Sequence, residues 1–351
     1  MNVQSLGGNG DGGNGQRFGH RFGVEIAGSG THVPDGKLTN QDLEKVMDTS
    51  DEWIIKRTGI HTRRRADYEN GETTSVLATH AMKRALENAE MDSKELDLLL
   101  VATMTCDSPT PSVGCMVADA IGCRDIGAMD INAACSGFLY TLSMADMMIR
   151  SGAYNSIGVI GADTITRHID YSNFGRGAAI LFGDGAAAMV LRRTDQPSVG
   201  MLGHKMHADG GGAKHLFIPS CEIDFPEGAE FDDRKINKVQ MNGQAVFKFA
   251  VTKFQEVIAE TLEDVQMSAD QVDHYVCHQA NLRILDSARE RFGIPSEKLL
   301  VNIDKYGNTV GASIPLVFDE LMRDGKIKPG QRVMFLAFGA GLTWGSSLWQ
   351  L

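Results

Sequence analysis

The stretch Thr73–Ala102, TTSVLATHAMKRALENAEMDSKELDLLLVA, decides the fold because it holds a helix, a linker and a strand in that order. Apolar residues recur along one stripe from Val76 to Ala89, and this spacing predicts an amphipathic helix over residues 73–90. The apolar run from Leu96 to Ala102 predicts a buried strand. Helices that alternate with short buried strands are typical of α/β proteins.

The same unit recurs in the second half of the chain. Apolar spacing predicts a helix over residues 246–265 and a strand over 272–277, and the linker Met91–Asp97 aligns with Met267–Asp273 at an offset of 176 in the numbering. A further pair of helices and strands, at an offset of 173, is predicted over 132–150, 157–160, 312–323 and 332–336. We interpret the chain as a tandem duplication whose two copies pack into one layered body with a pseudo-twofold axis.

The repeat and the composition divide the chain into three regions. Six of the first fifteen residues are glycine, and so polar a segment cannot repay its ordering entropy, which predicts a flexible tail over residues 1–22. The first copy of the repeat is assigned to residues 23–195 and the second copy to residues 196–351. The six glycines of the tail belong to a total of 39, so glycine is also frequent in the folded part.

Charge and hydropathy exclude several classes of protein. The net charge of −11 argues against a nucleic-acid backbone as partner, because such binding needs a basic surface. No apolar run approaches the ~18–20 residues that span a bilayer, and the amino terminus lacks a signal-peptide pattern. The six cysteines include no C-x-x-C pair, which indicates reduced thiols. We therefore expect a cytoplasmic enzyme that neither crosses a membrane nor is secreted.

Cys135 is the candidate nucleophile. It follows the predicted strand that begins at Ile126 and stands at the start of a predicted helix, between Ala134 and Ser136. Free amide groups and the positive end of a helix dipole lower a thiol pKa and supply donors for an oxyanion, so we expect a lowered pKa here. The small neighbours leave room for a ligand.

His278 and Asn308 are candidate hydrogen-bond donors. His278 directly follows the strand 272–277, at the end of the strand that faces the ligand crevice of α/β sheets. His274 and Cys277 lie nearby, but three ligands within one strand cannot converge on one ion, so no metal is expected. Asn308 follows Cys135 at the same offset of 173, which makes it nearly the counterpart of Cys135 in the second copy. A twofold axis would bring the two loops face to face.

Motifs in the order of one known family cover residues 23–351. They are Thr49–Ile54 with Arg57–Ile60, Ala133–Phe138, Phe182–Gly185, His207–Gly210, His278–Arg283, Gly307–Thr309 and Phe338–Gly345. In these motifs the chain resembles the thiolase-fold condensing enzymes, most closely the β-ketoacyl-acyl-carrier-protein synthase III family. The resemblance implies an α/β, thiolase-like fold of five layers, αβαβα, built from two duplicated halves.

The same resemblance implies a function and its residues. The family condenses an acyl-coenzyme A (acyl-CoA) primer with malonyl-acyl-carrier protein, releases carbon dioxide and initiates fatty acid biosynthesis as a homodimer. Cys135 would carry the acyl group on its sulfur, and the amides of Cys135 and Ala340 would form the oxyanion hole for the acyl carbonyl oxygen. His278 and Asn308 would bind the malonyl thioester carbonyl. Coenzyme A is a substrate, and no further cofactor is implied. Residues implied to bind coenzyme A are Trp53, Arg57 and Arg176, and those implied to dock the carrier protein are Lys248, Arg283 and Arg289 or Arg291.

Two positions depart from the family pattern. Thr110 stands before Pro111 where well-known members carry a Phe that caps the acyl pocket across the dimer interface, so chains longer than acetyl are expected to fit. Val310 and Gly311 replace a serine and an alanine of the family loop, which affects its packing and leaves Asn308 in place.

Two alternative functions stay open at this point. The motifs define the half-reactions and leave both substrates undefined, so a specialised ketosynthase of secondary metabolism, or one that condenses long acyl chains, is the first alternative. The order Cys135, His278, Asn308 also suits a papain-like cysteine protease, although the signature around the protease cysteine is absent.

Overall fold

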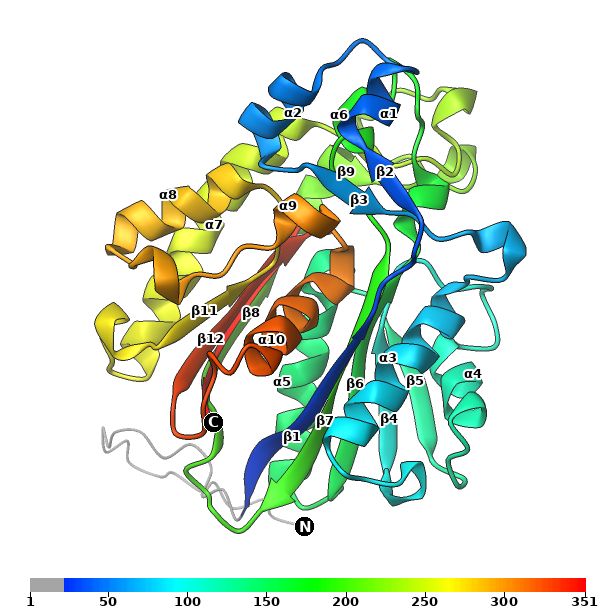
Figure 1. Ribbon diagram of the computed structural model, residues 1–351. Helices are drawn as coiled ribbons and strands as arrows, with labels where there is room; N and C mark the ends of the chain where they lie inside the picture. The colour runs from blue at the N-terminus through cyan, green and yellow to red at the C-terminus, as the bar shows by residue number, and fades with distance from the viewer. Residues whose placement is uncertain (1–21) are drawn as a thin grey trace, which may run out of the picture.

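Two mixed β-sheets form the frame of the protein, whose computed structural model describes residues 22–351 (Figure 1). The tail predicted over residues 1–22 lies outside this range except for Phe22. The first sheet has the order β1–β7–β6–β4–β5. Its strands are β1 (Gly23–His32), β4 (Leu98–Ala102), β5 (Gly127–Ile131), β6 (Ser156–Asp163) and β7 (Gly185–Thr194). In this sheet β4 is parallel to β5 and β6, whereas β7 is antiparallel to β6 and β1.

The second sheet repeats this arrangement with one strand fewer, in the order β11–β12–β13–β8. Its strands are β8 (Gly200–Ala208), β11 (His274–Cys277), β12 (Arg332–Gly339) and β13 (Thr343–Gln350). As in the first sheet, a parallel pair, β11 and β12, precedes an antiparallel strand, β13. Beside β11, where the first sheet has β5, there is a single bridge between Tyr275 and Leu299.

Helices complete five layers in the order α, β, α, β, α (Figure 1). The outer helices α3 (Thr74–Asn88) and α4 (Val113–Ala120) cover the first sheet, and α7 (Gly243–Asp264) with α8 (Leu282–Phe292) covers the second. Between the sheets lie α5 (Gly137–Arg150) and α10 (Ser313–Arg323), where Phe138, Phe318 and Trp349 pack in one buried cluster. The five-layered thiolase-like prediction is confirmed.

The remaining short strands and helices cap one end of the sheets. Short strands and helices are β2 (Lys37–Thr39), α1 (Asn40–Glu44), α2 (Asp51–Thr58), β3 (Thr62–Arg64), α6 (Arg176–Ala179), β9 (Leu216–Phe217), β10 (Gln240–Met241) and α9 (Ile303–Tyr306). The 3₁₀ turns span 68–70, 93–95, 134–136 (η3), 165–168, 210–215, 222–224, 233–235, 269–271, 296–298 and 310–312 (η10). Figure 1 places this cap at the end opposite the start of β1.

The sequence of each central element explains its position. β4 is buried over its whole length, as expected of a parallel strand covered on both faces. β1 approaches α3 closely because Gly28 and Gly30 lack a side chain: a Cβ at Gly28 would lie 2.5 Å from the carbonyl oxygen of Ala85. The apolar stripe predicted for this helix accordingly faces the sheet from Leu77 to Ala89, whereas Val76, predicted as its first residue, is 38% exposed.

Three pairs of corresponding elements in the two halves share one offset in the numbering. The first residues of β4 and β11, of α5 and α10, and of β6 and β12 all differ by 176 in the numbering. The expected offset of 173 for Asn308 was therefore wrong: the counterpart of Cys135 is Gly311. The two turns do match, since Ala134 (φ 47°) and Val310 (φ 52°) share a left-handed conformation. β7 ends at Thr194 and β8 begins at Gly200, and the division at 195/196 stays a prediction.

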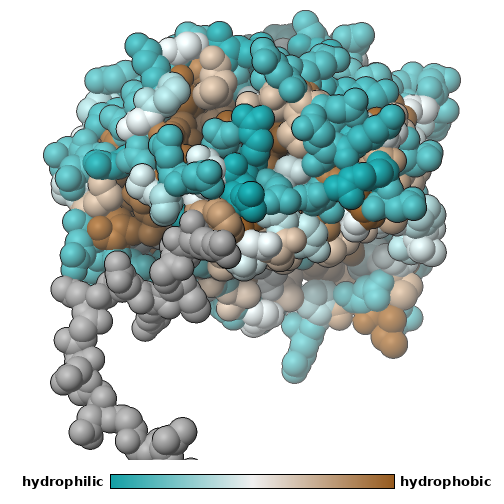
Figure 2. Space-filling model, turned by 90° about the horizontal axis from the view of Figure 1, so that it is seen from below, coloured by the Kyte–Doolittle hydropathy of each residue, from teal (hydrophilic) through white to brown (hydrophobic). Residues whose placement is uncertain are grey.

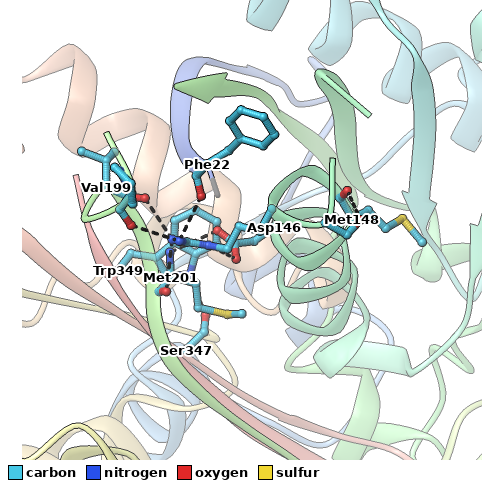
Figure 3. A network of polar contacts seen from close by, with 10 residues as sticks. Phe22, Asp146, Met148, Val199, Met201, Ser347 and Trp349 are labelled. Atoms are coloured by element: carbon cyan, nitrogen blue, oxygen red, sulfur yellow. Dashed lines mark hydrogen bonds and ion pairs between the residues drawn. The ribbon is translucent and has the colours of Figure 1, made fainter. Parts of the chain in front are cut away.

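The connection between the halves is anchored by a buried ion pair (Figure 3). Arg150 Nε lies 2.7 Å from Asp146 Oδ2, and the two side chains are 4% and 0% exposed. The guanidinium also donates to the carbonyl oxygens of Val199 (2.9 Å) and Met201 (3.2 Å), which flank the crossing into β8. Gly200 adopts φ +107° there, and a Cβ at this position would lie 2.5 Å from Arg150 Nη2.

We expect Arg150→Met to lower the free energy of unfolding by about 3–5 kcal/mol, because it leaves the Asp146 carboxylate buried without its partner. Urea denaturation of the variant measures this loss. The double variant Asp146→Leu/Arg150→Met, which buries no unpaired charge, should lose less. An equal loss in the single and double variants would show that the ion pair is not the cause.

The face that contains the start of β1 is mainly hydrophilic where the described residues are visible (Figure 2). Hydrophobic residues form separate small patches on this view rather than one continuous surface. Within residues 22–351, no helix is long and apolar enough to cross a membrane.

Candidate active site

A cavity of about 760 Å³ opens between the cap and the helices α7 and α8. Cys135, His278 and Asn308 all line it, although they come from η3, the end of β11 and the loop before η10. The other residues named for substrate binding that line the same cavity are Trp53, Arg57, Arg176 and Arg283. The structure therefore brings the three candidate catalytic side chains and the predicted coenzyme A residues into one space.

Cys135 lies in the 3₁₀ turn directly before α5 and is 7% exposed. Gly339, at the end of β12, approaches it so closely that a Cβ there would lie 2.7 Å from the Cys135 nitrogen. Thr343 Oγ1 lies within hydrogen-bonding distance of the carbonyl oxygens of Ala133 (3.2 Å) and Ala340 (3.1 Å). The loop containing Ala340 is therefore held beside the cysteine turn.

The expectation of a lowered thiol pKa at Cys135 was wrong. Burial raises the pKa of the Cys135 thiol well above its ordinary value, and the nearby Asp163 raises it further, while the cysteine's own amide lowers it only in part. The helix itself starts two residues later, at Gly137. The raised pKa keeps Cys135 a neutral thiol at neutral pH in the ligand-free protein.

His278 is a buried, neutral imidazole without a hydrogen-bond partner for its ring among the described residues. Its backbone nitrogen donates to the carbonyl oxygen of Leu336 (2.7 Å), and its ring meets the Phe338 ring edge-on at 5.5 Å. Neither Nδ1 nor Nε2 has a partner within residues 22–351. Burial lowers the pKa of His278 to about 3, so at neutral pH one ring nitrogen carries a proton that it can donate to a ligand.

Asn308 is held so that only its amide nitrogen is free for a ligand. Its backbone nitrogen donates to the carbonyl oxygen of Leu181 (2.8 Å), and its carbonyl oxygen accepts from Gly183 (2.9 Å). The side-chain Oδ1 accepts from the Val310 nitrogen at 2.9 Å. Since Nδ2 has no acceptor among the described residues, Asn308 and His278 offer two uncommitted donors to the same cavity.

Trp53 lines the cavity together with two guanidinium groups that lie against its ring. Arg57 and Arg176 lie over its ring at 5.3 and 5.4 Å from the centroid, and the indole is 37% exposed. Ser50 caps the helix that carries Trp53 and Arg57 by accepting from the Trp53 nitrogen at 3.2 Å. The end of this helix contacts α8, because Asn281 Nδ2 donates to the Arg57 carbonyl oxygen at 3.1 Å.

Of the remaining predicted residues, only Arg283 lines the cavity. Arg283 also lies over the Phe247 ring at 5.1 Å, and Lys248 is exposed on α7. Arg289 does not line the cavity and pairs with Asp286 at 3.2 Å. Thr110 is exposed and likewise lies outside the cavity of its own chain.

Two buried carboxylates support the site and were not predicted. Asp163 accepts from the Met104 and Gly311 nitrogens, both at 3.0 Å, and so joins the two halves below Cys135. Asp184 accepts from the Ala66 and Thr166 nitrogens, both at 2.8 Å. Burial raises the pKa of each carboxyl group to about 6. An acidic residue between two glycines in the motif Phe182–Gly185 was the available signal for Asp184.

The duplicated five-layered fold, with a cysteine at the start of a buried helix and His and Asn donors opposite, defines a thiolase-fold condensing enzyme, an acyltransferase. Models of 3-oxoacyl-[acyl-carrier-protein] synthase III match residues 129–210 and, for its C-terminal part, 262–351. The chain belongs to the β-ketoacyl-[acyl-carrier-protein] synthase III family. The alternative of a papain-like cysteine protease is therefore wrong.

Similarity to individual members extends over most of the chain. The β-ketoacyl-[acyl-carrier-protein] synthase III of Caldanaerobacter subterraneus subsp. tengcongensis is 43% identical over 92% of this chain and 96% of its own length. The crystal structure of the Aquifex aeolicus 3-oxoacyl-[acyl-carrier-protein] synthase III is 40% identical, with a TM-score of 0.86 over 94% of this chain and all of that chain (100%). The priming β-ketosynthase of the R1128 polyketide pathway is 33% identical, with a TM-score of 0.86 over 96% of this chain and 99% of its own.

Proposed function

We propose that the protein condenses an acyl-CoA primer with malonyl-acyl-carrier protein to give 3-oxoacyl-acyl-carrier protein, carbon dioxide and coenzyme A, and so initiates fatty acid biosynthesis. The observation that carries this proposal is the shared cavity of Cys135, His278 and Asn308, in which the last two side chains hold uncommitted donors. The test is stoichiometric: each 3-oxoacyl product should be accompanied by one released carbon dioxide and one released coenzyme A.

Acyl transfer to Cys135 is the first half-reaction. The Cys135 sulfur attacks the thioester carbonyl, the bond to the coenzyme A sulfur breaks, and the departing thiolate takes up the proton that Cys135 loses. The negative charge on the carbonyl oxygen develops beside the amides of Cys135 and Ala340. Because these two donors are already in place, they stabilise the charge without reorganisation. The close approach of Gly339 to Cys135 supports this placement of the two amides.

Decarboxylation of the malonyl thioester is the second half-reaction. When the carbon–carbon bond to the carboxylate breaks, its electron pair forms an enolate whose charge lies on the thioester oxygen. His278 and Asn308 would donate to that oxygen, and their burial strengthens both hydrogen bonds. The enolate carbon then attacks the acyl-Cys135 carbonyl, the bond to Cys135 breaks, and the Cys135 thiolate takes up one proton from solvent to restore the thiol.

Coenzyme A would enter at Trp53. The indole already stacks with Arg57 and Arg176, so the adenine would take the place of one guanidinium on the ring and leave both cations near the phosphates. The exposed cations Lys248 and Arg283 lie on the helices that border the cavity and suit an acidic carrier protein. Arg289 contributes less to this docking surface because Asp286 already neutralises it.

A homodimer in the cytoplasm completes the proposal. β5 forms one edge of the first sheet, and Met129 on this strand is 42% exposed, so its unpaired backbone can pair with a second copy. The exposed Thr110 lies between β4 and β5 in the sequence and would contact the acyl chain of the partner protomer. Gel filtration with light scattering measures the oligomeric state.

Primer length follows from the space behind Cys135. One protomer encloses about 30 Å³ of apolar space there, enough for about two water molecules. With Thr110 of a second protomer in place of the family Phe, we expect the enzyme to accept acyl chains longer than acetyl. Thr110→Phe should then lower the rate with the longer chains by about tenfold or more and spare acetyl-CoA.

An acyl-CoA series from acetyl to long-chain substrates measures this profile in the wild type, in Thr110→Phe and in the control Thr110→Ser. Identical profiles would contradict the role of Thr110. The series also tests the alternative of a specialised ketosynthase for secondary metabolism or long-chain condensation, which Thr110 favours and which predicts that acetyl-CoA is the poorer primer.

A further inference from the structure

Arg63 is a completely buried arginine below the active-site cavity. It lies at the centre of β3 and is 0% exposed. Nη1 donates to Asn40 Oδ1 and Nη2 to the carbonyl oxygen of Ile180, both at 2.5 Å. Nε is buried without a partner among the described residues, and no carboxylate there forms an ion pair with this guanidinium.

A buried cation with neutral partners is costly, so its presence calls for a reason other than stability. Burial lowers the pKa of Arg63 only to about 10, and the group therefore stays charged at neutral pH. An apolar side chain of similar length would fill the same space without the desolvation cost. The reason must lie in what the guanidinium holds in position.

Arg63 contacts both segments that hold Asn308. By donating to the carbonyl oxygen of Ile180, it anchors the start of the segment 180–183. Phe182 in this segment forms a parallel β-bridge with Asn308. Its aliphatic stem fills the space left by two glycines: a Cβ at Gly307 would lie 2.9 Å from Arg63 Cγ, and a Cβ at Gly183 would lie 3.1 Å from Arg63 Cβ. The turn that presents Asn308 is therefore packed directly on Arg63.

The other arm of the guanidinium leads to the coenzyme A end of the cavity. Asn40, which accepts from Nη1, donates through Nδ2 to Asp51 Oδ1 (2.7 Å) and to the carbonyl oxygen of Ile60 (2.9 Å). Asp51 begins α2, the helix that carries Trp53 and Arg57. One buried side chain thus connects the Asn308 turn with α2.

We propose that Arg63 is a positioning residue that holds the Asn308 amide where the malonyl thioester oxygen develops its charge. The inference rests on the proposed function and deepens it, since it predicts separate effects on the two half-reactions. Cys135 and its oxyanion amides lie on η3 and the Gly339–Gly341 loop, to which Arg63 makes no hydrogen bond within residues 22–351. Loss of Arg63 should therefore impair decarboxylation more than acyl transfer.

The test measures the two half-reactions separately in Arg63→Met and Arg63→Lys. Carbon dioxide release from malonyl-acyl-carrier protein should fall by about 10- to 100-fold in Arg63→Met, since small displacements of a catalytic group cost that much. Transfer of labelled acetyl to Cys135 at saturating acetyl-CoA should stay near the wild-type rate, and loss of the link to α2 should raise only the concentration of acetyl-CoA needed for saturation. Arg63→Lys, which keeps the charge and one contact, should release carbon dioxide at a rate between those of the wild type and Arg63→Met.

Arg150→Met is the matched control, because it removes a buried arginine far from the cavity. It should lose stability and keep the wild-type ratio of the two half-reactions when assayed where it is folded. A parallel fall of both half-reactions in the Arg63 variants, or no fall in either, would overturn the proposal. If Arg63→Met does not fold, Arg63→Lys decides by the same ratio.

The wild-type result separates this inference from the proposed function. A wild-type enzyme that released no carbon dioxide from the malonyl thioester would contradict the proposed function itself. A wild type that does so, with Arg63 variants of unchanged ratio, would contradict only the role of Arg63.

Discussion

Cys135→Ser should lower acyl transfer by about 10⁴-fold or more, because a hydroxyl in this buried site is a far weaker nucleophile than a thiol that can lose its proton. The wild-type protein should gain one acetyl group on incubation with acetyl-CoA, and the variant should gain none. Intact-protein mass spectrometry, followed by peptide mapping to Cys135, measures the gain.

Cys277→Ser is the matched control for this experiment. Cys277 is buried like Cys135 (0% against 7% exposed), burial likewise raises its pKa, and it does not line the cavity. The control should acquire the acetyl group at the wild-type rate. An acetyl group that persisted in Cys135→Ser but disappeared in Cys277→Ser would identify the wrong nucleophile and contradict the mechanism.

His278→Ala and Asn308→Ala should each lower malonyl decarboxylation by about 10²–10³-fold, the usual cost of removing one donor to a developing oxyanion. Acetyl transfer to Cys135 should be much less affected, because its oxyanion lies on the backbone amides. Single-turnover release of labelled carbon dioxide measures the first effect and protein labelling the second. Unchanged decarboxylation in either variant would exclude that residue as a donor.

The pH dependence tests whether His278 donates as a neutral ring. Because burial lowers its pKa from 6.5 to about 3, His278 should not titrate between about pH 5 and 8. The decarboxylation profiles of the wild type and of His278→Gln, whose side chain is a neutral donor at every pH, should then have the same shape. If His278 acted as a cation, the wild-type rate would rise relative to the variant as the pH falls through 6.5.

The fold could be predicted from the sequence where the information is local. The helix predicted over 246–265 is α7 (Gly243–Asp264), and the strand predicted over 272–277 is β11 (His274–Cys277). Apolar spacing indicates such elements directly, and the aligned linkers revealed the offset of 176 that three pairs of elements share. The error at Asn308 arose because the offset of 173 compares the ends of the helices predicted over 132–150 and 312–323, whereas the paired strands and the helix starts differ by 176.

The parts of the site that depend on distant contacts could not be predicted. Asp163 is bonded to Gly311, 148 residues away, and Arg63 to Ile180, 117 residues away, so no local pattern marks either side chain. The pKa of Cys135 was predicted from the helix start, a local feature. Its actual direction follows from burial by segments such as Gly339, which only the folded chain brings together.

The central claim, a decarboxylative condensation through acyl-Cys135, is tested most directly on the carrier protein itself. The enzyme is incubated with acetyl-CoA labelled in its acetyl group and with unlabelled malonyl-acyl-carrier protein, and the intact carrier protein is then weighed by mass spectrometry. We predict that the malonyl group is replaced by a four-carbon 3-oxoacyl group that contains the labelled acetyl carbons. A carrier protein that keeps its malonyl group, or that becomes acetyl-carrier protein without the label, would contradict the account.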